Sequence, residues 1–264
     1  MGGVAMRIRL VTALALVLVL VGSLAAAENP FAGTWKSNPA KSKLTGDTMK
    51  FAKTEAGAIR WSGSGLSYTF KMDGKEYKGP LGEAVVWKQI DDSTWETTYT
   101  RKGTLVDTDT SKLSPDGKTL TVVSKGTKPN GETFEDTTVY ERISGEKGLF
   151  GGWKDKQVKV SAPSTLEIAS SGKDGILFKS VDYKWTADAQ FDGKDYPATG
   201  PTMPEHVMLT LKHTGPRSFE MVVKQNGKAL SRDSYRVSQD GRTLTVAGSP
   251  IAVNEPYTVV YEKQ

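Results

Sequence analysis

Histidine is the side chain that most often acts as a general base or metal ligand near neutral pH. The chain of 264 residues holds two, His206 and His213, whose spacing matches no common metal-binding motif. It holds no cysteine, which excludes disulfides, thiol catalysis and thiolate metal sites. It also lacks a nucleophile elbow, a phosphate-binding loop and a dinucleotide fingerprint. We therefore expect no catalytic residue, no metal and no cofactor, and a non-enzymatic protein.

Two carboxylate patterns resemble catalytic or metal-binding arrangements. Glu96 and Glu220 occupy matched places in two similar segments, and a glycosidase needs two carboxylates flanking one bond. Both alternate away from the apolar residues of their segments, which predicts solvated strand surfaces. Asp107-x-Asp109 resembles the start of a calcium-binding loop, but the glycine and the closing acid of that loop are missing.

An internal duplication sets the organisation of the chain. Four blocks recur in the same order, at offsets of about 118 to 124 residues, as loop insertions would produce. They begin at Gly33 and Gly151, at Asp73 and Asp192, at Ser114 and Ser238, and at Val139 and Val260. Only two copies are present, each with its own start and finish. The pattern predicts two self-contained domains, over residues 28–143 and 149–264, with a small polar linker at 144–148.

The first 27 residues have the pattern of a secretory signal peptide. Arg7 and Arg9 precede a largely apolar run at residues 10–24, and Ala25-Ala26-Ala27 offers a cleavage site. We expect export to the periplasm or the extracellular space, with no stable membrane anchor after cleavage. The formal charge of +5 falls to +3 without the two arginines, and the remaining charges are interspersed. Nucleic-acid binders concentrate basic charge on one face, so no nucleic-acid partner is expected.

Alternation with a period of two predicts strands throughout each copy. Leu66, Tyr68, Phe70 and Met72, for example, alternate with polar residues. Asx-Gly pairs, as at Asp73-Gly74 and Asn226-Gly227, are typical of tight hairpins. We predict an all-β fold of two tandem antiparallel meanders, with about eight or nine strands each, closing into barrels. A flat β-sandwich is the alternative.

Each copy resembles the lipocalin and fatty-acid-binding-protein group, and most closely bacterial lipocalin-like secreted proteins of unknown function. The resemblance is carried by a Gly-x-Trp at the start of each copy, Gly33-Thr34-Trp35 and Gly151-Gly152-Trp153. It implies a barrel with the tryptophan at its base, covered by a basic residue of the last strand. Arg142 holds that place in the first copy and Lys263 in the second. It implies no catalytic residue, and a lumen that holds one hydrophobic small molecule.

A comparison of the inward positions suggests which lumen has more room. From the first copy to the second, Tyr68 becomes Ala187, Phe70 becomes Ala189 and Tyr99 becomes Val223. Most swaps shrink the side chain, so we hypothesise that the second copy carries the larger apolar cavity. The expected lumen residues are Trp185, Ala187, Ala189, Leu209, Leu211, His213, Phe219, Met221 and Val223.

Two functions remain open on the sequence. The first is an exported carrier or binding protein for an apolar small molecule held in a barrel lumen. The second is a surface interaction module for glycan or protein, which predicts clustered exposed aromatic residues, with Trp61 the one to examine. The sequence leaves the oligomeric state and the ligand undetermined.

Overall fold

The computed structural model describes residues 29–145, 147–201, 203–253 and 255–264, and these form strands almost throughout. The predicted signal peptide, 1–27, lies outside the described residues. A single short 3-10 turn, η1 (Pro39–Lys41), interrupts the described strands. No described helix is long and apolar enough to cross a membrane. The strands of the first half are β1 (Gly33–Ser37), β2 (Thr48–Lys53), β3 (Ile59–Gly63), β4 (Leu66–Phe70), β5 (Glu76–Lys78), β6 (Ala84–Gln89), β7 (Thr94–Arg101), β8 (Thr104–Leu113), β9 (Thr119–Thr127) and β10 (Thr133–Ser144). Those of the second half are β11 (Gly151–Lys159), β12 (Thr165–Ser171), β13 (Gly175–Ser180), β14 (Trp185–Gln190), β15 (Asp195–Thr199), β16 (Val207–Gly215), β17 (Ser218–Gln225), β18 (Lys228–Val237), β19 (Thr243–Pro250) and β20 (Tyr257–Lys263).

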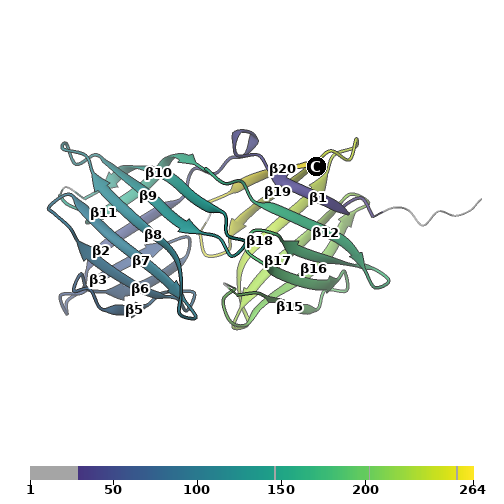
Figure 1. The fold of residues 1–264 in the computed structure, drawn as a ribbon, viewed down its shortest axis with the longest axis horizontal. Helices are drawn as coiled ribbons and strands as arrows, with labels where there is room; N and C mark the ends of the chain where they lie inside the picture. Colours follow the sequence, from purple (N-terminus) through teal and green to yellow (C-terminus); the bar gives the residue numbers. More distant parts are fainter. Residues whose placement is uncertain (1–28, 146, 202, 254) are drawn as a thin grey trace, which may run out of the picture.

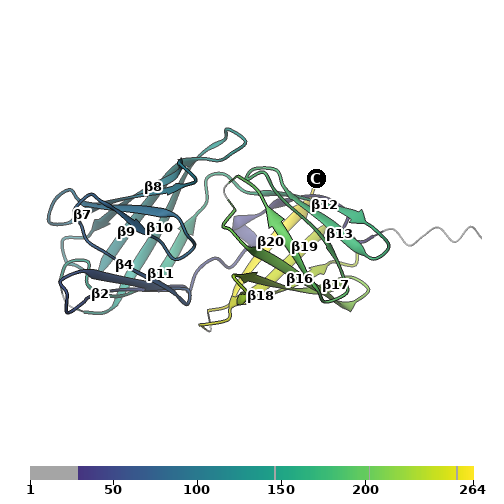
Figure 2. The ribbon, with the colours of Figure 1, turned by 90° about the horizontal axis from the view of Figure 1, so that it is seen from below.

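The strands form two antiparallel sheets of ten strands each, side by side in Figures 1 and 2. We call the sheet of β2 to β11 barrel 1, and the sheet of β1 with β12 to β20 barrel 2. Barrel 2 is closed, whereas barrel 1 curls nearly shut but has no hydrogen-bonded pairing between its edges, β4 and β5. The all-β barrel prediction is confirmed, with ten strands per barrel rather than eight or nine.

The first strand of each copy lies in the barrel of the other copy. β1 runs between β12 and β20 of barrel 2, where Trp35 is opposite Leu166 on one side and Lys263 on the other. β11 runs between β10 and β2 of barrel 1, where Trp153 is opposite Arg142 and Met49. The structure therefore differs from the predicted division at 28–143 and 149–264. Barrel 1 is continuous over 48–159 and is inserted between β1 and β12 of barrel 2. The chain crosses between the barrels at residues 38–47 and 160–164, and Figure 1 shows β1 beside β20.

The base of each barrel is built alike around its exchanged strand. Trp35 is fully buried and donates its indole N–H to the Phe31 carbonyl at 2.8 Å. Trp153 is equally buried and donates to the Leu149 carbonyl at 2.9 Å. Each basic residue stays in the barrel of its own copy and therefore covers the tryptophan of the other copy. Arg142 of the first copy lies 4.1 Å from the centre of the Trp153 ring, and Lys263 of the second lies 5.3 Å from that of Trp35.

A buried ion cluster holds the barrels together at the tip of the β9–β10 hairpin. Lys128 is 3% exposed, and its ammonium pairs with Glu132 at 3.0 Å and with Asp182 of barrel 2 at 3.8 Å. It also donates to the carbonyl of Ala162 at 2.7 Å. A buried lysine is tolerated where such partners replace its water. The contact fixes the hairpin tip of barrel 1 against the 160–164 crossing and the β13–β14 turn.

Candidate functional site

Most of the expected lumen residues lie together in the interior of barrel 2, where they are packed. Ala187, Ala189, Leu209, Leu211, Phe219 and Met221 are buried in one apolar cluster, with Trp185 and Val223 partly buried against it. Phe31 closes this core from outside the predicted strands, because its ring meets that of Phe219 edge-on at 4.8 Å. Phe219 in turn stacks on Tyr235 at 4.5 Å. Phe31 and Tyr235 fill space that the small side chains of the second copy leave.

His213 differs from the prediction that it lines this lumen. Its side chain is 44% exposed at the end of β16, where the ring stacks on Phe191 at 3.8 Å and Nε2 lies 3.0 Å from an Asp174 oxygen. The strand alternation points it inward, and β16 still pairs with β17 there, but the pairing of β16 with β15 ends at Thr210. His213 is thus a rim residue.

Barrel 1 carries polar side chains at the end of its interior that faces barrel 2. Glu83 and Arg101 lie at the ends of β6 and β7 and form an ion pair at 3.3 Å, with side chains 10% and 17% exposed. Asp107 is the fourth residue of β8 and pairs with Tyr99 of β7. Oδ1 of Asp107 and Oγ1 of Thr97 are buried and have no hydrogen-bond partner among the described residues. A buried polar atom without a hydrogen-bond partner destabilises the fold, so these two oxygens are candidates for contact with a ligand.

A second layer of polar groups lies deeper in the same barrel. Asp109 accepts a hydrogen bond from the Ser124 hydroxyl at 2.5 Å. The Tyr68 hydroxyl accepts one from the indole N–H of Trp87 at 2.8 Å. These bonds hold the two aromatic rings and the carboxylate in fixed positions beneath Asp107.

Burial and mutual repulsion shift the acidities in this polar end. The pKa of Asp107 is raised to about 7, chiefly by burial and also by the neighbouring carboxylate of Asp109, while Arg101 acts to lower it. Burial also raises the pKa of Asp109, against the hydrogen bonds from Ser124 and Tyr99. Burial raises the pKa of Tyr68 to about 12, so its hydroxyl stays neutral. Asp107 is consequently the group whose charge changes near neutral pH.

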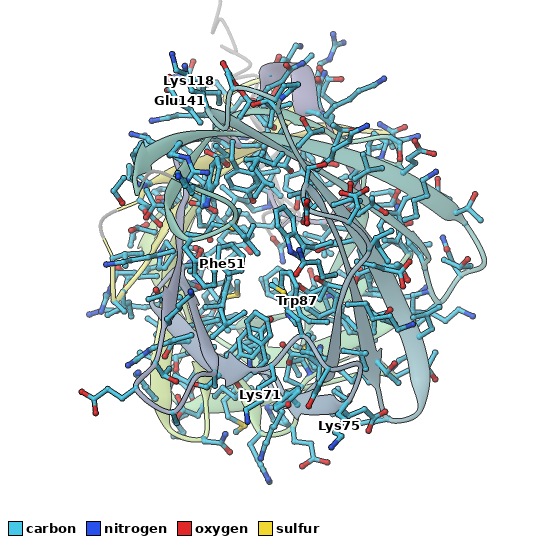
Figure 3. All side chains as sticks on the ribbon, turned by 90° about the vertical axis from the view of Figure 1, so that its left-hand side faces the viewer. Phe51, Lys71, Lys75, Trp87, Lys118 and Glu141 are labelled. Carbon is cyan, nitrogen blue, oxygen red and sulfur yellow. The ribbon has the colours of Figure 1, made fainter. Side chains whose placement is uncertain are left out.

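Aromatic rings form the remaining wall of this interior. Phe70 stacks on Trp87 with ring centres 4.7 Å apart, and Tyr68 stacks on Phe70 at 5.4 Å. Figure 3 looks into the barrel and shows Phe51 and Trp87 reaching inward from opposite walls, and their ring centres lie 5.7 Å apart. Carboxylates beside neutral aromatic faces are the surroundings that bind organic cations.

Other sequence candidates lie outside this arrangement. Glu96 and Glu220 lie on the outer faces of different barrels, where they pair with Lys88 at 3.8 Å and Arg232 at 2.5 Å. They therefore do not flank one glycosidic bond. Trp61 tilts against Tyr68 at 5.6 Å and packs on the core of barrel 1. The large hydrophobic side chains exposed in the described part of the chain are aliphatic: Ile90, Leu105, Ile143 and Ile251. Within the same part, no group of three or more acidic or histidine side chains could hold a metal ion.

The polar end is what the sequence reasoning missed, although the signal was present. Asp107 and Asp109 alternate in step with Ser111 and Leu113, which places all four on one face of β8. The calcium-loop pattern does not apply to Asp107 and Asp109, because they lie on a strand, which presents alternate residues on one face, and a loop does not.

The comparisons with known proteins returned no relatives. No family model, no curated protein and no solved structure matches the chain significantly.

Proposed function

We propose that the chain is an exported, non-enzymatic binding protein for a small molecule, and that barrel 1 is the binding barrel. The ligand is amphipathic, with a cationic hydrogen-bond donor that faces Asp107 and an apolar part that packs on the aromatic wall. The observation that carries the proposal is the pair of buried, unpartnered oxygens, Asp107 Oδ1 and Thr97 Oγ1, inside a barrel. This proposal replaces the purely apolar ligand expected from the sequence with an amphipathic one.

The charge of the polar end supports a cation. Asp107, Asp109 and Glu83 supply three carboxyl groups, and Arg101 opposes them with one guanidinium. A protonated amine beside Asp107 would favour the ionised carboxylate and would donate to its unpartnered oxygen. Tyr68, Tyr99 and Trp87 would offer ring faces to the rest of such a molecule.

Two probes of equal shape and opposite charge test the proposal. Isothermal titration calorimetry at pH 8 should detect binding of 2-phenylethylamine and none of 3-phenylpropanoate. Asp107→Asn should abolish amine binding, because it removes the charge and keeps the shape. Asp233→Asn is the matched control, since Asp233 lies two positions from the corresponding place in β18 and accepts hydrogen bonds from Tyr257 and Ser231.

The outcomes separate the two functions that the sequence left open. Equal binding of both probes, or binding unaffected by Asp107→Asn, would contradict a cation site in barrel 1. Native mass spectrometry of the protein purified from its exported fraction adds a second readout, since a carrier should retain a small molecule. The surface-module alternative predicts clustered exposed aromatic residues. The large hydrophobic side chains exposed in the described residues are aliphatic and give it no support.

A further inference from the structure

A cleft between the barrels has the size and charge of a second binding site. It measures about 510 Å³, within the usual range for small-molecule sites. Turns of both barrels line it, at Pro80 to Gly82 and Arg101 to Lys102 on one side and at Met203 to His206 and Gln225 to Asn226 on the other. The Gln225 amide ties the two sides, because it donates to the carbonyls of Leu81 at 3.5 Å and Glu205 at 3.4 Å.

The two sides of the cleft are corresponding turns of the two copies, and they differ in charge. Val85 pairs with Tyr99 as Leu209 pairs with Val223, so the turns correspond at an offset of 124 residues. Barrel 1 presents Arg101 and Lys102 where barrel 2 presents Gln225 and Asn226. Lys78 adds a third positive charge, and Glu205 is the one acidic residue among those that line the cleft. Positive charge is therefore concentrated on one side of the cleft.

His206 provides an independent observation. Its φ of +56° lies in the left-handed region, which costs energy for a side chain other than glycine. The corresponding residue in barrel 1 is Gly82, with a φ of +89°, so this turn accepts glycine readily. Four other described non-glycine residues share this conformation, so what distinguishes His206 is that its side chain lines the cleft.

We propose that this cleft binds a small organic anion carrying two or more negative charges. Arg101 is held in place by Glu83 at 3.3 Å, and Lys78, Lys102 and His206 surround the space as further donors. Charge-assisted hydrogen bonds to carboxylate or phosphate oxygens are stronger than neutral ones. The cleft shares Arg101 with the polar end of barrel 1, but its other donors, Lys78, Lys102 and His206, line the cleft, and it takes a ligand of opposite charge.

Citrate and inorganic phosphate are the probes, measured by calorimetry at low ionic strength. The double variant Lys78→Gln/Lys102→Asn should weaken citrate binding roughly tenfold or more, because it removes two cations. Asparagine keeps the turn, since Asn226 occupies the same place in barrel 2 with a φ of +50°. Lys184→Asn is the matched control: Lys184 is an exposed turn lysine with a φ of +51° outside the cleft, and its substitution should leave binding unchanged.

His206→Gly divides strain from binding. It should raise the melting temperature of the free protein, because it relieves the backbone, and should weaken citrate binding. Failure of both citrate and phosphate to bind the wild-type protein would overturn the proposal. So would equal citrate affinity in the wild type, the double variant and His206→Gly. Binding of 2-phenylethylamine should be the same in all these variants, so this site and the barrel 1 site can fail separately.

Discussion

Barrels 1 and 2 have matching strands, but the side chains at matching inward positions differ in polarity. Barrel 1 has Glu83, Thr97 and Tyr99 facing inward, whereas barrel 2 has Val207, Met221 and Val223 at those points. Asp107 corresponds to Ser231, and Ser111 to Tyr235. One set gives a packed apolar core closed by Phe31, and the other leaves two buried oxygens without partners. One barrel scaffold can thus hold an apolar interior in one copy and buried polar groups beside its core in the other.

The exchange of first strands links the two barrels. Disulfide crosslinking gives the clearest test, because exchanged and unexchanged strands bring different residues together. The chain has no cysteine, so any disulfide reports an introduced pair. Thr34→Cys with Glu167→Cys should crosslink on oxidation, because these residues are cross-strand neighbours in β1 and β12. Without the exchange, Thr34 would take the place of Gly152 beside Lys50. Thr34→Cys with Lys50→Cys should then stay reduced, and a crosslink in this second pair alone would contradict the exchange.

Removing either base tryptophan should weaken the barrel of the other copy. Trp153→Ala should destabilise barrel 1, and Trp35→Ala barrel 2, by about 3–5 kcal/mol, the usual cost of deleting a buried tryptophan. Hydrogen exchange can locate the loss, in β7 to β9 for Trp153→Ala and in β17 to β19 for Trp35→Ala. Loss of protection in the barrel of the same copy would show that the strands are not exchanged.

The buried Asp107 should make the stability of barrel 1 depend on pH. The folded state raises its pKa from 3.8 to about 7, so between these values the folded protein holds a proton that the unfolded chain releases. Its contribution is fully present below pH 3.8 and is lost as the pH rises through about 7. Asp107→Asn should be more stable than the wild type at pH 7.5 by on the order of 2 kcal/mol, a figure reduced for partial exposure. Chemical denaturation at pH 4 should show little difference, and a larger gain at pH 4 would contradict this assignment.

Exchanging the basic residue that covers each base tryptophan should cause the smallest changes in stability. Arg142 donates to the carbonyls of Gly117, Phe150 and Gly148 at 2.6, 2.8 and 2.5 Å while covering Trp153. Arg142→Lys should cost about 1–2 kcal/mol, because lysine cannot reproduce the planar fork. Lys263→Arg should raise the stability of barrel 2 by less than about 1 kcal/mol. Thermal unfolding measures both changes. An unchanged melting temperature for Arg142→Lys would mean that the guanidinium contacts contribute nothing.

The sequence predicts the strands, the barrels and the burial of both base tryptophans, because alternation and Asx-Gly turns are local signals. It does not predict the exchange. The Gly-x-Trp segments of the two copies are so alike that either fits either barrel, and the choice depends on residues 38–47 and 160–164, which carry no periodic pattern. Phe31 precedes the first strand and was missed for the same reason. The alternation in β8 would have placed Asp107 inward had the segment been interpreted as a strand. Its unpartnered oxygen depends on the geometry of the neighbouring strands.

A ligand site at Asp107 is tested most directly by titrating its carboxyl carbon by NMR, with and without 2-phenylethylamine, and with Asp233 as the internal reference. Free Asp107 should titrate with an apparent pKa of about 7. The amine should lower it clearly, because a bound cation favours the carboxylate, and should leave the Asp233 curve where it was. An Asp107 curve that does not move at saturating amine, or an Asp233 curve that moves instead, would contradict a ligand site in barrel 1.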